Sequence, residues 1–146
     1  MKRGDFLRAL SRDHHRGLSA AVRLKRTTSA TAAKDRERFL DFWRAEGRRH
    51  FRVEEEVLLP AYARHGQVDD PVVARVLTEH VDLRRRAIDL EANKRPEVDQ
   101  LRELGQRLQR HIRHEERVLF PKIEAAIPEC EQGDLAEAIE RAERAD

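Results

Sequence analysis

A histidine followed four residues later by a glutamate occurs twice in this chain, each time within a segment that ends in proline. The first segment, residues 50–60, carries His50 and Glu54, and the second, residues 111–121, carries His111 and Glu115. On an α-helix, residues four apart lie one turn apart on the same face. An imidazole and a carboxylate side by side are ligands that a transition metal accepts. The repeated pair therefore predicts a metal site built from both segments.

Two further histidines interrupt apolar helical stripes. His14 lies on a stripe with Leu10, and His80 lies on a stripe with Leu83. A single histidine on an apolar face is usually a core residue that one hydrogen bond satisfies. Four such histidines, one on each expected long helix, together with two carboxylates, predict a shared polar cluster instead.

Burying the two carboxylates requires a compensating positive charge. An unpaired buried carboxylate costs several kcal/mol even after relaxation, and a domain has only about 5–15 kcal/mol of net stability. The apolar stripes carry no Lys or Arg at that level, so we expect bound cations. Four imidazoles and two carboxylates suit two iron ions better than one structural zinc, which four ligands would saturate. Two carboxylates can bridge two metals and leave positions open for a small ligand.

Neighbouring residues compete for two of these ligand positions. His14 falls on the apolar stripe and is favoured over His15, which lies about 100° further around the helix. Glu115 is favoured over Glu116 because it lies one turn from His111. Glu116, like Glu55, is expected either to support the ligands or to be solvated, and His65 and His114 are expected to face solvent. The candidate metal ligands are therefore His14, His15, His50, Glu54, His80, His111 and Glu115.

Apolar residues at helical spacing predict four long helices and one short helix. Pro60 is expected to kink the second of them, and an aspartate before Pro71 is suited to begin the third. Gly133 and Asp134 are expected to open the short amphipathic helix at the end. The expected helices cover about residues 5–26, 31–64, 71 to the break at 94–96, a fourth closing near 128, and 134–145.

Short connections between long amphipathic helices make neighbouring helices antiparallel, which favours an up-down-up-down four-helix bundle. The fold class expected is all-α, in a single domain over residues 1–146, with the bundle at about 5–128 and a short extra C-terminal helix. In such a bundle the second and fourth helices run parallel, so the two His-Glu pairs reach a similar depth and face each other.

Composition restricts the expected class of protein further. Of the 146 residues, 40% are charged and 5% are aromatic, and the net charge is only +2, with the two signs interleaved. Such a sequence favours helices and lacks a basic arm or an aromatic platform, so nucleic acid is not an expected partner. The single Cys130 excludes an internal disulfide framework. Without an apolar run of membrane-spanning length or a signal peptide, we expect no membrane partner and a cytoplasmic location.

The constellation resembles the hemerythrin-like (HHE cation-binding) domain family over about residues 5–128. The resemblance rests on the Leu10–His15 run, His50-x3-Glu54, Thr78-Glu79-His80 and His111-x3-Glu115. It implies a four-helix bundle around a non-haem di-iron centre, in which two Fe ions are bridged by carboxylates and an oxo or hydroxo group.

Two positions depart from the oxygen-carrying hemerythrins. Those proteins have a further histidine ligand four residues after the one on the third helix, where this chain has Arg84. They also have an aspartate five residues after the histidine of the fourth helix, where this chain has Glu116. The result resembles the four-His, two-Glu site of iron-sulfur repair proteins and of hemerythrin-like iron and oxygen sensors. One imidazole fewer implies a more open iron that reacts with oxygen, peroxide or nitric oxide.

Three functions remain open from the sequence. The first is a di-iron protein that binds or senses oxygen, nitric oxide or peroxide. The second is an enzyme or repair factor that turns over peroxide or nitric oxide, or delivers iron to damaged iron-sulfur clusters. The third is an iron-storage or iron-responsive interaction module whose short C-terminal helix docks a partner. For the fold itself, that helix is expected to pack either on the bundle or on a partner, which includes a second copy of the chain.

Overall fold

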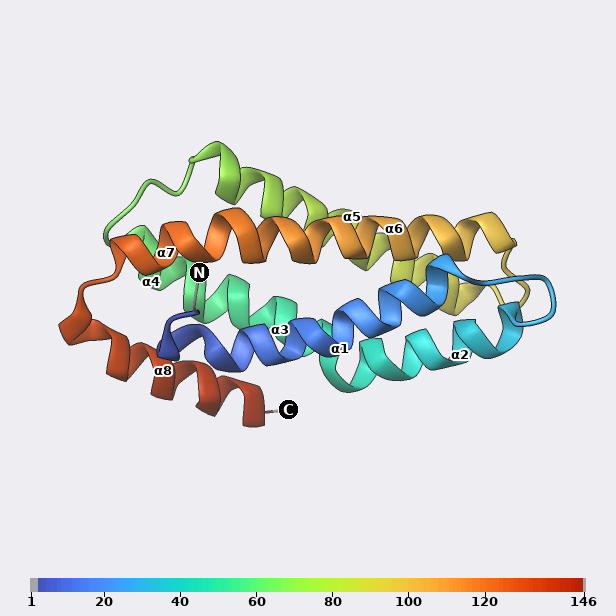
Figure 1. Cartoon of the computed structure of the whole chain (residues 1–146), viewed down its shortest axis with the longest axis horizontal. Helices are drawn as coiled ribbons and strands as arrows, with labels where there is room; N and C mark the ends of the chain where they lie inside the picture. Colours follow the sequence, from blue (N-terminus) through green and yellow to red (C-terminus); the bar gives the residue numbers. More distant parts are fainter. Residues whose placement is uncertain (1–2, 146) are drawn as a thin grey trace.

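The computed structural model describes residues 3–145, which form an all-helical bundle of four long rods and one shorter helix (Figure 1). The first rod is a short 3-10 turn, η1 (Asp5–Leu7), followed by α1 (Arg8–Lys25), and α5 (Pro71–Ala92) is the third. The second rod consists of α2 (Ala32–Phe42), η2 (Trp43–Gly47), α3 (Arg48–Val53), η3 (Glu54–Leu58) and α4 (Leu59–Ala63). The fourth consists of α6 (Val98–His114), η4 (Glu115–Leu119) and α7 (Phe120–Ala126). Successive rods run in opposite directions, and the all-α up-down-up-down bundle expected from the sequence is confirmed.

Both ends of α5 are fixed by side chains. At its start the carboxylate of Asp70 accepts a hydrogen bond from the backbone N–H of Val72 at 2.8 Å, and Pro71 occupies the first turn, as expected. At its end the buried guanidinium of Arg36 donates to the backbone carbonyls of Leu90, Glu91 and Asn93 at 2.9–3.1 Å. The last carbonyls of a helix lack a full set of donors within it, and Arg36 supplies donors to them from the neighbouring rod.

The elements η2, η3 and η4 are π-helical turns, in which one extra residue widens the helix. Two of them begin at the glutamates of the repeated pair, η3 at Glu54 and η4 at Glu115. Pro60 and Pro121 each follow one of these turns within two residues. A proline lacks an N–H and clashes with the carbonyl four residues earlier, and a wide turn relieves that clash. The irregularity expected at Pro60 therefore takes the form of a π-helical turn.

Apolar side chains form two separate buried clusters, one towards each end of the bundle. One contains Phe120 and residues of η1, η3, α7 and α8, and the other contains Phe51, Trp43 and residues of α1, α2, α5 and α6. The ring of Phe120 stacks on His14 at a centroid distance of 5.1 Å, and Phe51 stacks on His80 at 3.9 Å. The predicted polar residues therefore lie between the two apolar clusters.

The last helix, α8 (Glu129–Arg144), begins earlier than the sequence predicted. Pro128 supplies its N-cap position, so Gly133 lies inside the helix instead of opening it. Its buried residues Leu135 and Ile139 pack against η1, η3 and α3, and α8 runs back along the outside of the bundle (Figure 1). Of the two packing alternatives for this helix, the structure shows the one on the bundle. No helix in residues 3–145 is long and apolar enough to cross a membrane.

Candidate metal centre

Six of the seven predicted ligands converge at the middle of the bundle. His14 comes from α1, His50 from α3, Glu54 from η3, His80 from α5, and His111 and Glu115 from α6 and η4. All six are buried, with at most 6% of any residue exposed. Their ligand atoms form two groups within which the atoms lie 4.8 Å or less apart: His14, His50, Glu54 and Glu115 in one, and Glu54, His80, His111 and Glu115 in the other. The two groups share both glutamates and differ in their imidazoles.

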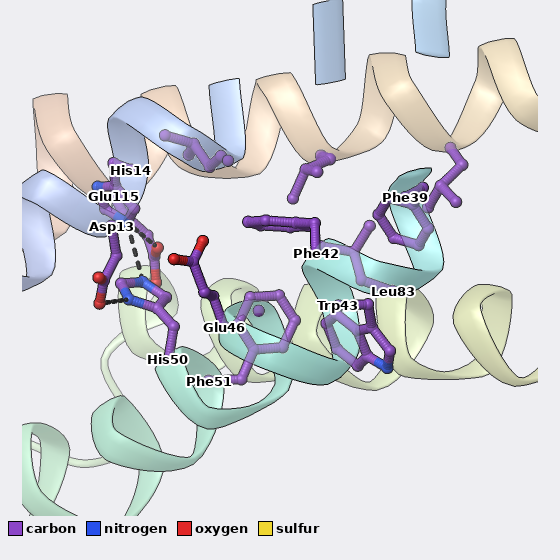
Figure 2. Close-up of a pocket in the computed structure, with 15 residues that line it drawn as sticks. Asp13, His14, Phe39, Phe42, Trp43, Glu46, His50, Phe51, Leu83 and Glu115 are labelled. Carbon is purple, nitrogen blue, oxygen red and sulfur yellow. Dashed lines mark hydrogen bonds and ion pairs between the residues drawn. The ribbon is translucent and has the colours of Figure 1, made fainter. Parts of the chain in front are cut away.

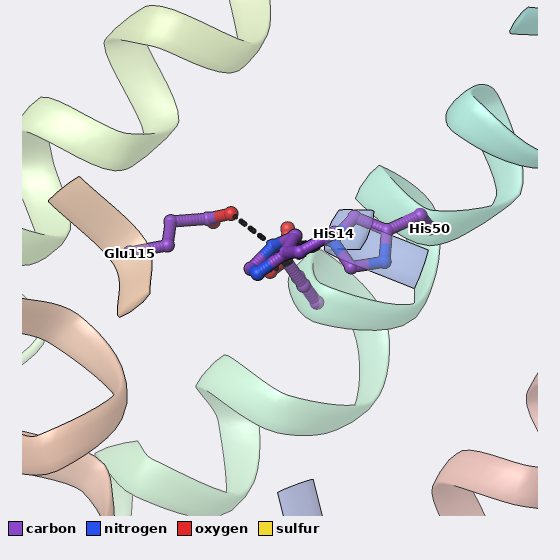
Figure 3. Close-up of side chains that lie close together, drawn as sticks. His14, His50 and Glu115 are labelled. Atoms are coloured by element: carbon purple, nitrogen blue, oxygen red, sulfur yellow. Dashed lines mark hydrogen bonds and ion pairs between the residues drawn. The ribbon is translucent and has the colours of Figure 1, made fainter. Parts of the chain in front are cut away.

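The glutamate oxygens are divided between the two groups. Glu54 directs Oε2 to Nε2 of His50 and Oε1 to Nε2 of His80, each at 3.2 Å. Glu115 directs Oε1 to Nε2 of His14 at 3.0 Å and of His111 at 3.3 Å, and its Oε2 lies 3.5 Å from Nε2 of His80. Figure 3 shows the His14 ring between Glu115 and His50. All four imidazoles therefore face the centre with the same nitrogen, and both carboxylates are placed to bridge two cations.

Several atoms of this cluster lack a hydrogen bond although they are fully buried. They are both oxygens of Glu54, Oε2 of Glu115, and Nε2 of His80 and of His111. Buried polar atoms without a partner cost free energy, and such atoms call for an ion or water that satisfies them. Within the described residues, Glu54 and Glu115 form ion pairs with histidines only. The imidazole nitrogens and carboxylate oxygens are a donor set that first-row transition metals accept, so the residues present fit a pair of cations.

A second layer of carboxylates holds the imidazoles in place. The Nδ1 of each ligand histidine is hydrogen-bonded to a different carboxylate: His14 to Glu116 at 2.7 Å, His50 to Asp13 at 2.9 Å, His80 to Glu55 at 2.7 Å and His111 to Glu79 at 2.8 Å. A carboxylate can only accept here, so Nδ1 carries the proton and the lone pair of Nε2 can face a metal. Each ring is thereby fixed in both orientation and tautomer.

Sequence reasoning left Glu55 and Glu116 open and assigned no role to Asp13 or Glu79. The structure places all four against ligand imidazoles on another helix. Each is the immediate sequence neighbour of a ligand, as Glu55 is of Glu54, and lies about 100° around the helix from it. That rotation turns an acidic side chain beside a ligand towards the adjacent helix. The acidic residues directly beside His14, Glu54, His80 and Glu115 were therefore the available signal.

The seventh predicted ligand, His15, is not brought to the cluster. It lies on the exposed face of α1, because one residue beyond His14 the helix has turned towards solvent. Glu115 is fully buried in the cluster, whereas Glu116 is half-buried, as the helical spacing predicted. His65 is exposed and pairs with Glu131 at 3.0 Å.

Without a metal, the cluster is held together by ion pairs. Burial alone would lower the pKa of His111, but the negative charge of Glu115, 3.3 Å from its Nε2, and the hydrogen bond to Glu79 raise that pKa to about 9. Burial would also lower the pKa values of the other three ligand histidines, but nearby carboxylates raise these pKa values instead. Glu115 and Glu116 act on His14, Glu54 and Asp13 on His50, and Glu115, Glu54 and Glu55 on His80. Burial would raise the pKa of Glu115, but His111 above all holds it well below the usual range. Protonated imidazoles thus supply the positive charge that compensates the buried carboxylates, whereas from the sequence we expected bound metals alone to supply it.

An apolar cavity of about 30 Å³ opens beside the edge of the cluster formed by His14, His50 and Glu115 (Figure 2). It extends away from these residues towards the aromatic side chains of Phe39, Phe42 and Trp43. Twelve of its fifteen lining residues are buried, and Asp13, Phe42 and Glu46 are half-buried. The cavity therefore approaches the surface where these last three side chains lie, between α1 and η2.

Comparison with known proteins gives one match. Residues 6–123 match the model of the hemerythrin HHE cation binding domain. Neither a curated protein nor a solved structure matches the chain. The matched segment runs from η1 into α7 and contains all six clustered residues.

Proposed function

The chain belongs to the hemerythrin HHE cation-binding domain family, and from this premise we propose that its buried cluster binds two iron ions and that the iron-loaded protein binds or senses oxygen, nitric oxide or peroxide. The observation that carries the proposal is the sharing of Glu54 and Glu115 between two imidazole pairs. A single-metal site would need only one of these groups.

The donor set favours iron over a structural zinc. Structural zinc sites are closed by four ligands and commonly include cysteine, whereas Cys130 is exposed and takes no part in the cluster. Imidazole and carboxylate ligands on facing helices are the set that di-iron bundles use. Iron in such a site supplies electron transfer and coordination positions that a small ligand can occupy.

The cavity beside His14 and His50 supports binding of a small, weakly polar molecule. On the same measure of volume, a single water needs about 10–15 Å³, so about 30 Å³ matches a molecule of two heavy atoms. Its walls are mainly phenylalanine, tryptophan and aliphatic side chains. Because apolar cavities exclude water and admit apolar molecules, these walls favour oxygen or nitric oxide over peroxide.

Ion pairs lie where the cavity approaches the surface, beside its half-buried lining residues. The exposed Arg16 pairs with Glu46 at 2.7 Å and with Asp13 at 3.1 Å. The pair with Glu46 joins η2 to α1 beside Phe42. In this proposal Arg16 and Glu46 control how fast a ligand reaches the metal centre.

The alternative functions are separated by turnover and by partner binding. A di-iron enzyme consumes peroxide or nitric oxide repeatedly, whereas a binding or sensing protein reacts stoichiometrically. A module that recruits a partner through α8 would have to use its outer face, because Leu135 and Ile139 are already buried against the bundle. No observation gives either alternative an advantage over ligand binding.

The proposal is tested by loading the protein with ferrous iron under nitrogen, measuring the iron bound per chain, and recording absorption spectra on adding oxygen, nitric oxide or peroxide. We expect two irons per chain and a spectral change with at least one ligand. The variant Glu54→Ala should lose the iron, and the matched variant Glu56→Ala, at an exposed position on the same turn, should retain it. Full iron content without any spectral change would refute ligand binding, and iron retained by Glu54→Ala would refute the site.

A further inference from the structure

Arg84 connects the surface of the bundle to one of the ligand imidazoles. It lies on α5 one turn after His80, and Nη2 of its guanidinium donates to both oxygens of Glu55 on η3 at 3.1 Å. Glu55 in turn accepts from Nδ1 of His80 at 2.7 Å. The carboxylate is therefore held between a cation and an imidazole N–H, and it ties α5 to the second rod of the bundle.

The same guanidinium also contacts the aromatic ring that covers His80. The Cζ of Arg84 lies 5.7 Å from the centroid of the Phe51 ring, within cation–π range. Phe51 stacks on the His80 ring at 3.9 Å with an interplanar angle of 5°. Arg84 thus acts on His80 by two routes: Glu55 holds the edge of the ring, and Phe51 holds its face.

A second arginine repeats this arrangement on the other group of ligands. Arg3 pairs with Glu116 at 3.4 Å, and Glu116 is bonded to Nδ1 of His14. The Cζ of Arg3 lies 5.5 Å from the Phe120 ring, and Phe120 stacks on His14 at 5.1 Å with an interplanar angle of 17°. The same set of an arginine, a carboxylate, a phenylalanine and a histidine therefore occurs once for each proposed metal.

Among residues 3–145, the other two ligand imidazoles, those of His50 and His111, lack such a set. Their carboxylates, Asp13 and Glu79, pair with Arg16 and Arg75, which come from the same helix three or four residues away. Both of these arginines are about half exposed, and in residues 3–145 neither lies over an aromatic ring as Arg3 and Arg84 do. The two sets that join different segments and grip an aromatic ring are those of Arg3 and Arg84.

We propose that Arg84 and Arg3 are positioning residues for the metal centre, each of which clamps a carboxylate and a phenylalanine and thereby aims Nε2 of one ligand histidine at the metal. The clamp on His80 keeps Nε2 directed at Oε1 of Glu54, 3.2 Å away. A guanidinium suits this role because its planar fork can bond a carboxylate and lie against a ring at once, which an ammonium group does less well. The inference rests on the metal-binding part of the proposed function.

The test compares Arg84→Gln with Arg84→Lys and with Arg85→Gln. Arg85 is the next residue on α5, is exposed, and pairs with Asp82 and Asp89 instead of Glu55, so it is a matched control. The first measurement is hydrogen exchange of the His80 Nδ1 proton, by NMR of metal-free protein labelled with ¹⁵N at histidine. The second is the dissociation constant for zinc, a redox-inert probe, measured by competition with a chelator.

We expect Arg84→Gln to speed exchange of the His80 proton and to weaken zinc binding by about tenfold, the lower end of the range for loss of a residue that orients a ligand. Arg84→Lys should recover part of both effects because it keeps the charge, and Arg85→Gln should change neither. If Arg84→Gln leaves both unchanged while Glu55→Gln alters them, Arg84 is only a surface ion pair and the proposal is wrong.

If Arg84→Gln fails to fold, the same two measurements are made on Arg3→Gln, with exchange of the Nδ1 proton of His14 in place of that of His80. Faster exchange there, with weaker zinc binding, supports the proposal, and unchanged values overturn it. The readouts on metal-free and zinc-loaded protein do not depend on ligand chemistry at iron. If the iron-loaded protein shows no spectral change with oxygen, nitric oxide or peroxide, the proposed function is refuted. The role of Arg84 and Arg3 is then still decided by the proton-exchange and zinc-binding measurements.

Discussion

Metal uptake at neutral pH should release protons, because the metal-free cluster stores them on the imidazoles that would become ligands. A metal requires the neutral form of histidine. The pKa of His111 is raised to about 9 in the metal-free protein, so at pH 7 about 99% of this side chain is protonated. The pKa values of His14, His50 and His80 are raised in the same direction. His111 alone should release close to one proton, and the other three imidazoles should add to it.

The affinity for metal should depend on pH, because the metal displaces protons from the ligand histidines. For each proton displaced, the apparent dissociation constant should fall about tenfold per pH unit until the pH passes the pKa of that histidine. For His111 the window extends up to about pH 9. Zinc titration in weakly buffered solution with a pH-indicator dye measures the protons, and repetition from pH 6.5 to 8.5 measures the slope. His15→Ala should release the same number of protons, because His15 lies outside the cluster.

The stability of the metal-free protein should show the opposite pH dependence. The pKa of His111 is higher in the folded chain, about 9, than its ordinary value of 6.5. Its ionic contribution is therefore complete below pH 6.5 and is lost as pH rises through 9, a loss of about 3 kcal/mol from this residue. Chemical unfolding of metal-free protein at pH 6.5 and 9.5 measures this change. Zinc binding without proton release, together with stability that does not fall at high pH, would refute the account of a cluster held by imidazolium–glutamate pairs.

Three further predictions follow from individual contacts. Glu54→Gln should weaken binding of both metals together because the two groups share Glu54; stepwise zinc titration measures this, and loss of one metal alone would contradict it. Glu46→Ala removes the ion pair with Arg16 and should raise the association rate of nitric oxide with the iron-loaded protein, measured by stopped flow. The increase should be at most about fivefold, because a partly exposed ion pair contributes no more than about 1 kcal/mol. The control Glu91→Ala, which breaks the exposed pair with Arg44, should leave this rate unchanged. Arg36→Met should lower the free energy of unfolding by about 2 kcal/mol, because it removes charged hydrogen bonds to the carbonyls at the end of α5; an unchanged denaturant midpoint would show that water replaces the guanidinium.

The helical periodicity of the sequence was sufficient to predict the bundle and to predict that six polar residues lie close together inside it. His80 and Glu115 were predicted because each lies in register with apolar residues that must face the interior, and register is a local property of the sequence. The same rule distinguished His14 from His15. Here the structure agrees because the side of a helix that a residue occupies depends on spacing alone.

Features that depend on contacts between helices could not be predicted in the same way. The bond from Glu79 to His111 joins residues on different helices, and their approach depends on how α5 and α6 are rotated against each other. The protonated state of the metal-free cluster was missed for a similar reason, since it depends on distances between buried groups. The start of α8 was placed at Gly133 and Asp134, but the helix begins directly after Pro128, whose backbone is extended, and Gly133 is tolerated inside the helix at an exposed position.

The central claim is that Glu54 and Glu115 are shared by two metal positions, and the most direct test is a crystal structure of the iron-loaded protein with anomalous diffraction data at the iron edge. The account predicts two iron peaks, one beside His14 and His50 and one beside His80 and His111, with both glutamates between them. A single peak, or peaks that do not contact Glu54 and Glu115, would contradict it.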